Sequence, residues 1–234
     1  MAYIANGFIS AIHIILRFDR EFTDIVLRSV LVSFTATMLA GAIAVPLFMF
    51  LGLRRFRGES IVSRLLNTFM SIPTVVVGLV VMLLLARRGP FGRLELLYSV
   101  RAMIIAQVIL VFPLVAAMTF ELAKQSGRTI RNLAHTLGAG RLQATALAIA
   151  ELKNVLFIYI ITTFSRAISE VGAVMMVGGN INGQTNVMTT TISRYNSMGE
   201  YEMAIALGMI LLLTSCVINR AAYSFREKGV KHGS

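Results

Sequence analysis

Long apolar runs without a charged residue constrain this chain more than any other feature. Four such runs cover residues 29–53, 65–86, 102–120 and 203–219, and a fifth, 154–177, is charged only at Arg166 and Glu170. A helix needs about 20 apolar residues to cross the hydrocarbon of a bilayer. The chain is therefore predicted to be an all-α membrane protein with about five transmembrane helices in a single domain, residues 1–234.

The composition agrees with a membrane protein and excludes several other classes. Hydrophobic residues make up 56% of the 234 residues and charged residues 14%, whereas a soluble domain carries about 25% charged residues. The net charge of +11 comes from Lys and Arg that flank the apolar runs, which indicates lipid headgroups rather than nucleic acid. Cysteine and histidine are too scattered to ligate a metal: they stand at Cys216, His13, His135 and His232.

The orientation follows from the basic residues in the loops. Lys and Arg are more numerous around 54–64, in 121–153 and after 219 than in the remaining loops. Because basic loops stay in the cytoplasm, we expect the N-terminus outside and the C-terminus inside. The apolar segment 4–16 is short for a span and is predicted to be interfacial or re-entrant, with a sixth span left open.

Proline and glycine punctuate the predicted spans. Pro46, Pro73 and Pro113 each remove a backbone hydrogen bond and should kink a helix. Small residues allow close helix contacts, here at Gly41, Gly78 and Gly172. These features suit a transport pathway and also a plain helix bundle. Five spans do not divide into the inverted repeats of secondary transporters, so a pathway at the two-fold interface of a homodimer is favoured.

The loop 121–153 is too long for a simple connector. Its pattern predicts a helix that ends near Gly138 and Gly140, followed by a second helix. A short, partly apolar helix on the cytoplasmic side suits insertion into a partner's groove; the alternative is a helix that lies on lipid.

The stretch NLAHTLGAG resembles the coupling loop of ABC importer permeases, whose pattern is Glu-Ala-Ala, three residues, then Gly. Asn132 stands at the Glu position, Leu133 and Ala134 at the Ala positions, and Gly138 at the Gly. The acidic residue is missing, and Ala-Glu replaces the later Leu-Pro of the family. The resemblance implies that this loop docks on a separate ATPase through Asn132, Leu133, Ala134, His135, Thr136, Leu137, Gly138, Ala139, Gly140 and Arg141.

A second stretch, SRAISEVGAVMMVGGNINGQT at 165–185, is similar to the penultimate span of oxyanion permeases for molybdate, sulfate and tungstate. The form with Ser169 before Glu170 most resembles the tungstate branch. The resemblance implies a type I ABC importer permease fold and the import of an oxyanion, most closely tungstate. The same machine for molybdate, sulfate or an amino acid remains open, as does an ion-coupled carrier or channel that acts alone.

Polar residues within the spans are candidates for the pathway or its gate. Arg166 and Glu170 stand at i and i+4 and are predicted to share one helical face; because a charge in a span costs about 2.5–3.5 kcal/mol, such groups face a cavity. They either contact the substrate or form a gating pair. Hydroxyls beside the kink at Ser71, Pro73 and Thr74 either line an anion path or bond to their own helix. Gly179 and Asn180 either form an outer gate or belong to an ordinary loop.

The chain lacks the loop that binds nucleotide phosphates. That loop requires glycine before lysine, and the residues before the four lysines are Ala, Leu, Glu and Val. The chain is therefore predicted to be no enzyme and to bind no cofactor, with ATP and Mg on partner ATPases. The expected partners are a second permease copy, two cytoplasmic ATPase subunits, an external substrate-binding protein and membrane lipid, without nucleic acid. The expected location is the cytoplasmic (inner) membrane, multi-pass.

Overall fold

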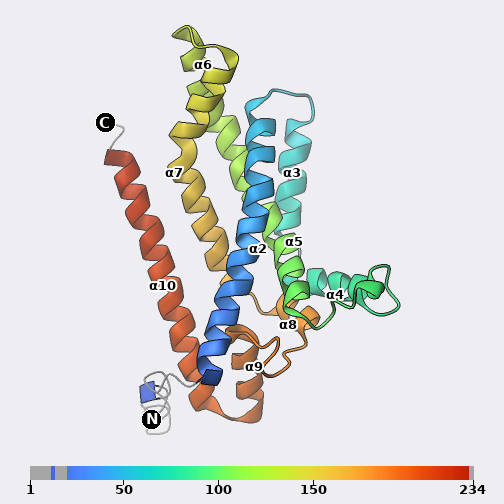
Figure 1. The fold of residues 1–234 in the computed structure, drawn as a ribbon. Helices are drawn as coiled ribbons and strands as arrows, with labels where there is room; N and C mark the ends of the chain where they lie inside the picture. Colours follow the sequence, from blue (N-terminus) through green and yellow to red (C-terminus); the bar gives the residue numbers. More distant parts are fainter. Residues whose placement is uncertain (1–11, 14–19, 232–234) are drawn as a thin grey trace. The chain divides into compact units, whose positions relative to one another are not determined.

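The computed structural model describes residues 12, 13 and 20–231, and side chains as far as residue 220. Apart from residues 12 and 13, the predicted interfacial segment 4–16 lies outside the described residues. The described part is helical and contains no strand, which confirms the all-α prediction (Figure 1). Its elements are α2 (Arg20–Leu53), α3 (Glu59–Met70), α4 (Thr74–Leu85), η1 (Gly92–Leu94), α5 (Val100–Leu122), η2 (Ala123–Gly127), α6 (Arg128–Thr136), α7 (Arg141–Ile168), α8 (Gly172–Gly178), α9 (Met188–Met198) and α10 (Tyr201–Lys231).

Four helical stretches in the described residues are long and apolar enough to cross a membrane, and one further pair of helices passes the same test only when its two members are taken together. The four are α2, α5 continued through α6, α7, and Tyr201–Arg220 of α10. The predicted span 65–86 is divided at residues 71–73 into α3 and α4. Pro73 is the residue before α4, where a missing N–H costs nothing. Pro46 and Pro113 lie inside the continuous helices α2 and α5, so only Pro73 coincides with a break.

The fourth predicted span, 154–177, differs from the observed helices. Helix α7 begins at Arg141, inside the predicted loop 121–153, and ends at Ile168. Residues 141–153 are rich in Ala and Leu, which favour helix even where charges end the apolar run. Beyond Ile168 the chain leaves the helix and starts again as α8, whose Ala173 N–H donates to the Glu170 carboxylate over 3.2 Å. The side chain of Glu170 thus caps a new helix rather than extending the old one.

The chain divides into two compact units that share its long helices. Unit 1 comprises Met1–Ala36, Pro73–Gln107 and Ser165–Ile218, and unit 2 comprises Thr37–Ile72, Val108–Phe164 and Asn219–Ser234. In unit 1, α4 packs directly on α8: a Cβ on Gly78 would lie 2.6 Å from the Cα of Ala173. Glycine is required at that crossing because the neighbour is backbone, and the predicted role of Gly78 in close packing is confirmed.

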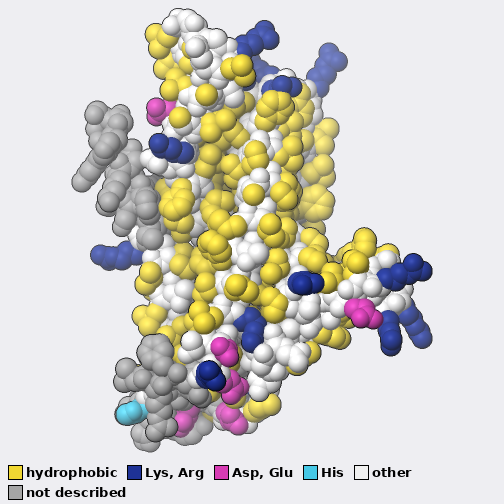
Figure 2. Space-filling model, in the orientation of Figure 1, with side chains coloured by type: hydrophobic (Ala, Val, Ile, Leu, Met, Phe, Trp, Pro, Cys, Tyr) yellow, Lys and Arg dark blue, Asp and Glu magenta, His cyan; other side chains and the backbone are white. Residues whose placement is uncertain are grey.

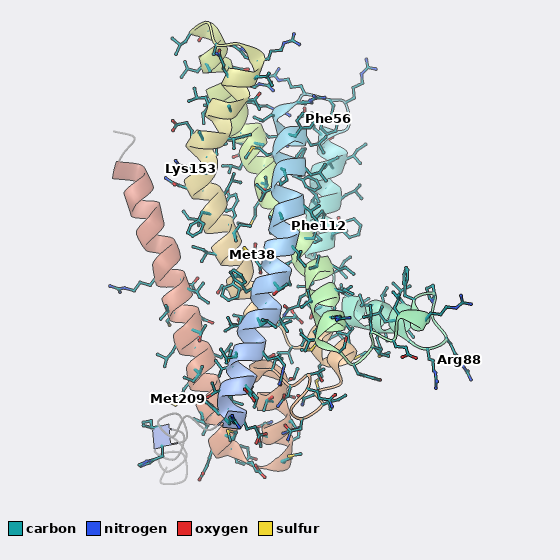
Figure 3. The ribbon with its side chains drawn as sticks, in the orientation of Figure 1. Met38, Phe56, Arg88, Phe112, Lys153 and Met209 are labelled. Atoms are coloured by element: carbon teal, nitrogen blue, oxygen red, sulfur yellow. The ribbon has the colours of Figure 1, made fainter. Side chains whose placement is uncertain are left out.

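Unit 2 is built on small and aromatic side chains from α2, α3, α5 and α7. Phe48 packs edge-on against Phe112 and Phe120, with ring centroids 6.1 and 6.3 Å apart, and Phe112 is seen among the α5 side chains in Figure 3. A Cβ on Gly41 would lie 2.6 Å from Ile160 Cδ1. Hydrophobic side chains cover much of the helix surface in the face shown, as a bilayer requires (Figure 2).

Candidate functional site

The predicted coupling loop is a helical hairpin in unit 2. It consists of η2, α6 and the first turns of α7. Helix α6 ends at Thr136, and Gly138 follows with φ +88°, a left-handed conformation that costs little only for glycine. The Gly138 and Ala139 N–H groups donate to the carbonyls of His135 and Ala134, both over 3.0 Å, which satisfies the helix end. The predicted helix end at Gly138 is confirmed.

The tip of this hairpin exposes leucine. Leu133, Leu137 and Leu142 have 62%, 80% and 88% of their surface accessible, while Ala134 between them is buried against the chain. Exposed apolar side chains that gather at one end of an element mark an interaction surface. The hairpin therefore has the form of a docking element, with Asn132 and Thr136 exposed beside the leucines.

Arg128 holds the hairpin to its base. Its Nε donates to the Gly52 carbonyl over 2.7 Å and its Nη2 to the Arg54 carbonyl over 2.6 Å. Both terminal nitrogens also contact the Glu59 carboxylate, at 3.0 and 2.8 Å. One guanidinium thus bonds carbonyls at the end of α2 and a carboxylate at the start of α3. Its planar group of N–H donors makes this possible, and lysine has no such group. The sequence analysis missed this residue, because its ion-pair partner lies 69 positions away and no local pattern marks it.

An apolar cluster fixes the hairpin below Arg128. It contains Met49, Leu53, Ala123, Ala148, Leu152 and Leu156. Contact is close at two glycines: a Cβ on Gly52 would lie 2.6 Å from Ala123 Cβ, and one on Gly127 would lie 2.8 Å from Leu53 Cδ2. The single π-helical turn η2 between them lets α5 run on into α6, an arrangement often found at functional sites.

The prediction that Arg166 and Glu170 share one helical face and pair is wrong, and the alternative, contact with the substrate, stays a prediction. Arg166 is exposed in the last turn of α7, whereas Glu170 is 8% exposed and lies in the break before α8. Because α7 ends at Ile168, the two residues do not share a helical face. The ion pairs found within the described residues are Glu121 with Lys124 and Glu59 with Arg128.

The break between α7 and α8 is held by hydrogen bonds within unit 1. Gln107 Nε2 donates to the Ala167 carbonyl over 2.9 Å, and Thr189 Oγ1 donates to the Glu170 carbonyl over 2.8 Å. These bonds satisfy the carbonyls that the broken helix frees. Hydrogen bonds from α5 and α9 therefore stabilise the break between α7 and α8.

The predicted residues at the start of α4 meet this break. A Cβ on Gly172 would lie 3.1 Å from Thr74 Oγ1 and 2.7 Å from Val75 Cγ2, so α4 begins directly against the start of α8. Pro73 is the preceding residue, and its φ of −58° suits a helix start. The Ser71 hydroxyl donates to the Asn67 carbonyl over 3.1 Å, which is the alternative expected for a hydroxyl that bonds to its own helix.

The loop after α8 is tightly hydrogen-bonded. Gly179 has φ +68°, and a Cβ there would lie 2.7 Å from the Tyr98 ring. The Asn180 amide donates to the Thr190 carbonyl over 3.2 Å and accepts from Thr190 Oγ1 over 2.9 Å. Thr185 Oγ1 donates to the Gly178 carbonyl over 2.6 Å. The amide of Asn180 is thus engaged with Thr190 of α9.

Arg28 on α2 ties the far side of the same loop. Its guanidinium donates to the carbonyls of Gly183 and Asn186, over 2.9 and 3.0 Å, and the side chain of Asn186 also accepts from it. Ser29 adds a bond from the Met188 N–H over 2.7 Å. The sequence analysis counted Arg28 only as a flanking charge, because its partners lie on a loop more than 150 positions away.

Membrane-length helices together with an exposed apolar hairpin define a multi-pass membrane protein with a surface that can receive a partner. Residues 42–228 match the family model described as binding-protein-dependent transport system inner membrane component. The chain belongs to this family. Its members are membrane subunits rather than enzymes, and they work with a separate ATPase and a substrate-binding protein.

Two curated relatives cover almost the whole chain, and a third covers about three quarters of it. The tungstate uptake system permease protein of Peptoclostridium acidaminophilum is 53% identical over 228 residues, which is 97% of this chain and 100% of the relative. The protein of the same name from Campylobacter jejuni is 32% identical, over 96% of this chain and 94% of the relative. A sulfate transport system permease protein of Synechococcus elongatus is 29% identical, over 76% of this chain and 69% of the relative.

Proposed function

We propose that this chain is the membrane permease of an ATP-driven importer that carries tungstate across the cytoplasmic membrane. The observation that carries the proposal is 53% identity over nearly the full length of a tungstate permease. The similarity to a sulfate permease is much lower, at 29%. The stretch SEVGAV at 169–174 supports the same branch.

The machine contains two copies of the permease, two ATPase subunits and an external binding protein. ATP and Mg are held by the ATPases, which bind the hairpin formed by α6 and α7; exposed Leu133 and Leu137 supply the apolar contact. The N-terminus lies outside and the C-terminus inside. Only 22% of the most apolar stretch of α7 and 11% of that of α10 is buried within one chain, so the second copy and lipid cover these helices.

The pathway runs along the helix breaks. Broken helices present backbone N–H groups and hydroxyls, which stabilise an anion without trapping it as a lysine would. The candidate residues are Ser71, Pro73, Thr74, Arg166, Glu170, Gly179 and Asn180. Exposed Arg166 supplies the positive potential that draws a divalent oxyanion inward.

Uptake measurements test this function. Cells that express the permease with its ATPase and binding protein should accumulate tungsten from tungstate. A roughly tenfold excess of sulfate should compete little, because the importer discriminates between the two oxyanions. Removal of the ATPase should abolish uptake, because the chain has no nucleotide site. Uptake by the permease alone under an ion gradient would favour the lone carrier, and equal competition by sulfate would contradict the tungstate assignment.

A further inference from the structure

A basic hollow lies in unit 2 beside the coupling hairpin. Its volume is about 760 Å³, and it opens between the end of α2 and the facing turns of α6 and α7. Arg54, Arg131, His135 and Arg141 line it, and Phe50 and Leu142 provide an apolar side. The side chain of Arg128, which bonds the end of α2 and the start of α3, does not line this hollow.

The charges in the hollow lack an anionic partner. No carboxylate lines it, and the ion pairs within the described residues, Glu121–Lys124 and Glu59–Arg128, lie elsewhere. The Nε of Arg131 is buried and donates to no acceptor, although a buried charged donor without a partner is costly. Three guanidiniums around one cavity therefore favour an oxyanion that accepts several hydrogen bonds at once.

We propose that this hollow binds the phosphate headgroup of an anionic phospholipid. Arg54 is the first charged residue after the apolar run 29–53, so the hollow stands at the border between hydrocarbon and headgroups. The adjacent Phe50 is 52% exposed and Leu142 is 88% exposed. A free phosphate has no use for an apolar wall and would fill little of the volume, whereas a lipid uses both the charge and the wall. Basic pockets at the cytoplasmic ends of membrane helices bind anionic headgroups in this way.

The bound lipid would support the coupling hairpin. Arg131 and His135 lie one turn apart on α6, and Arg141 opens α7, so one headgroup joins both arms of the hairpin to the end of α2. The proposal rests on the proposed function only for the side of the membrane and the role of the hairpin. Its chemical content, an anionic headgroup in this hollow, rests on three arginines without a carboxylate partner, of which Arg54 lies 3.8 Å over the Phe50 ring.

Binding to the purified permease–ATPase complex in detergent tests the site. The probes are dihexanoyl-phosphatidylglycerol, dihexanoyl-phosphatidylcholine and inorganic phosphate, with affinity read from native mass spectrometry and from the shift in melting temperature. The change Arg131→Gln with Arg141→Gln should weaken phosphatidylglycerol binding by about fivefold per arginine removed, the effect of one basic residue near an anionic surface. Lys153→Gln removes an exposed charge from the same helix α7 (Figure 3) and should leave binding unchanged.

Three results would overturn the proposal. The first is equal affinity for phosphatidylglycerol in the double variant and in Lys153→Gln. The second is binding of phosphatidylcholine as tight as that of phosphatidylglycerol. The third is equally tight binding of inorganic phosphate, which would make the hollow a site for a free anion. If the double variant does not assemble, Arg131→Gln alone decides between the same outcomes. ATPase co-purification is scored on the same samples: a permease that binds the lipid but never the ATPase would refute the proposed function and leave the lipid site intact.

Discussion

Gly138 acts through its backbone alone. It has φ +88°, and a Cβ placed on it would meet nothing within 4 Å, so steric crowding cannot explain a defect there. A β-branched residue in the left-handed region is strained by about 1–2 kcal/mol. We predict that Gly138→Val inserts normally in the membrane but redirects the leucines of the hairpin, which weakens ATPase association and stimulation and abolishes uptake.

The matched control is Gly138→Asn, because asparagine tolerates the left-handed region. It should retain most ATPase association, measured by co-purification, and most substrate-stimulated hydrolysis. Full assembly, stimulation and uptake in Gly138→Val would mean that the hairpin is not the coupling element.

Arg128 gives a second prediction at the residue scale. Its fork bonds two carbonyls and one carboxylate at once, and lysine cannot reach all three. Arg128→Lys should leave the membrane level unchanged and reduce substrate-stimulated ATP hydrolysis, because a single ammonium replaces the planar guanidinium that bonds three acceptors. Arg57→Lys, at an exposed arginine nearby, should behave as wild type. If both variants are equally active, the clamp has no part in coupling.

The elements that the sequence predicted best are those defined by length and hydrophobicity. The runs 29–53, 102–120 and 203–219 fall within α2, α5 and α10. The sequence did not predict the first and last residues of α7, because a charged residue ends an apolar run without ending a helix. The break at Glu170 escaped because the hydrogen bonds that hold it come from Gln107 and Thr189, distant in the sequence.

The same contrast separates the parts of the candidate site. The turn at Gly138 follows from a local rule about glycine, so the sequence alone was sufficient. The hydrogen bonds of Arg128 and Arg28 depend on carbonyls that are distant in the sequence and that only the fold brings close to these guanidiniums. The expected pairing of Arg166 with Glu170 assumed one continuous helix, and its failure has the same cause as the misplaced end of α7.

The break between α7 and α8 makes a prediction at the element scale. The Glu170 carboxylate accepts the Ala173 N–H as a capping side chain does, and loss of such a cap costs about 1 kcal/mol. Glu170→Ala should lower the melting temperature of the solubilised chain, whereas Glu170→Gln keeps an acceptor oxygen and should melt near the wild type. Equal destabilisation of the two variants would show that the charge, rather than the cap, holds the break.

For the whole molecule, the broken pair α3–α4 decides the topology. If the pair crosses the membrane, the loops on either side of it lie on opposite faces of the bilayer. If it is a re-entrant loop, both lie on one face, and α5 then crosses in the reverse direction. By length and composition the pair fits either arrangement, and the positive-inside rule favours the crossing.

Cysteine labelling distinguishes the two arrangements. The sequence contains one cysteine, Cys216, which is exposed, so Cys216→Ser gives a background for single cysteines at Arg57, Arg88 and Leu137. All three parent residues are exposed, and Arg88 points outward from the loop after α4 (Figure 3). In intact cells a membrane-impermeant maleimide should label Arg88→Cys alone, and the other two should react only after the membrane is opened. Labelling of Arg57→Cys and Arg88→Cys from the same side would make α3–α4 re-entrant, and labelling of Leu137→Cys from outside would remove the hairpin from the reach of any cytoplasmic ATPase.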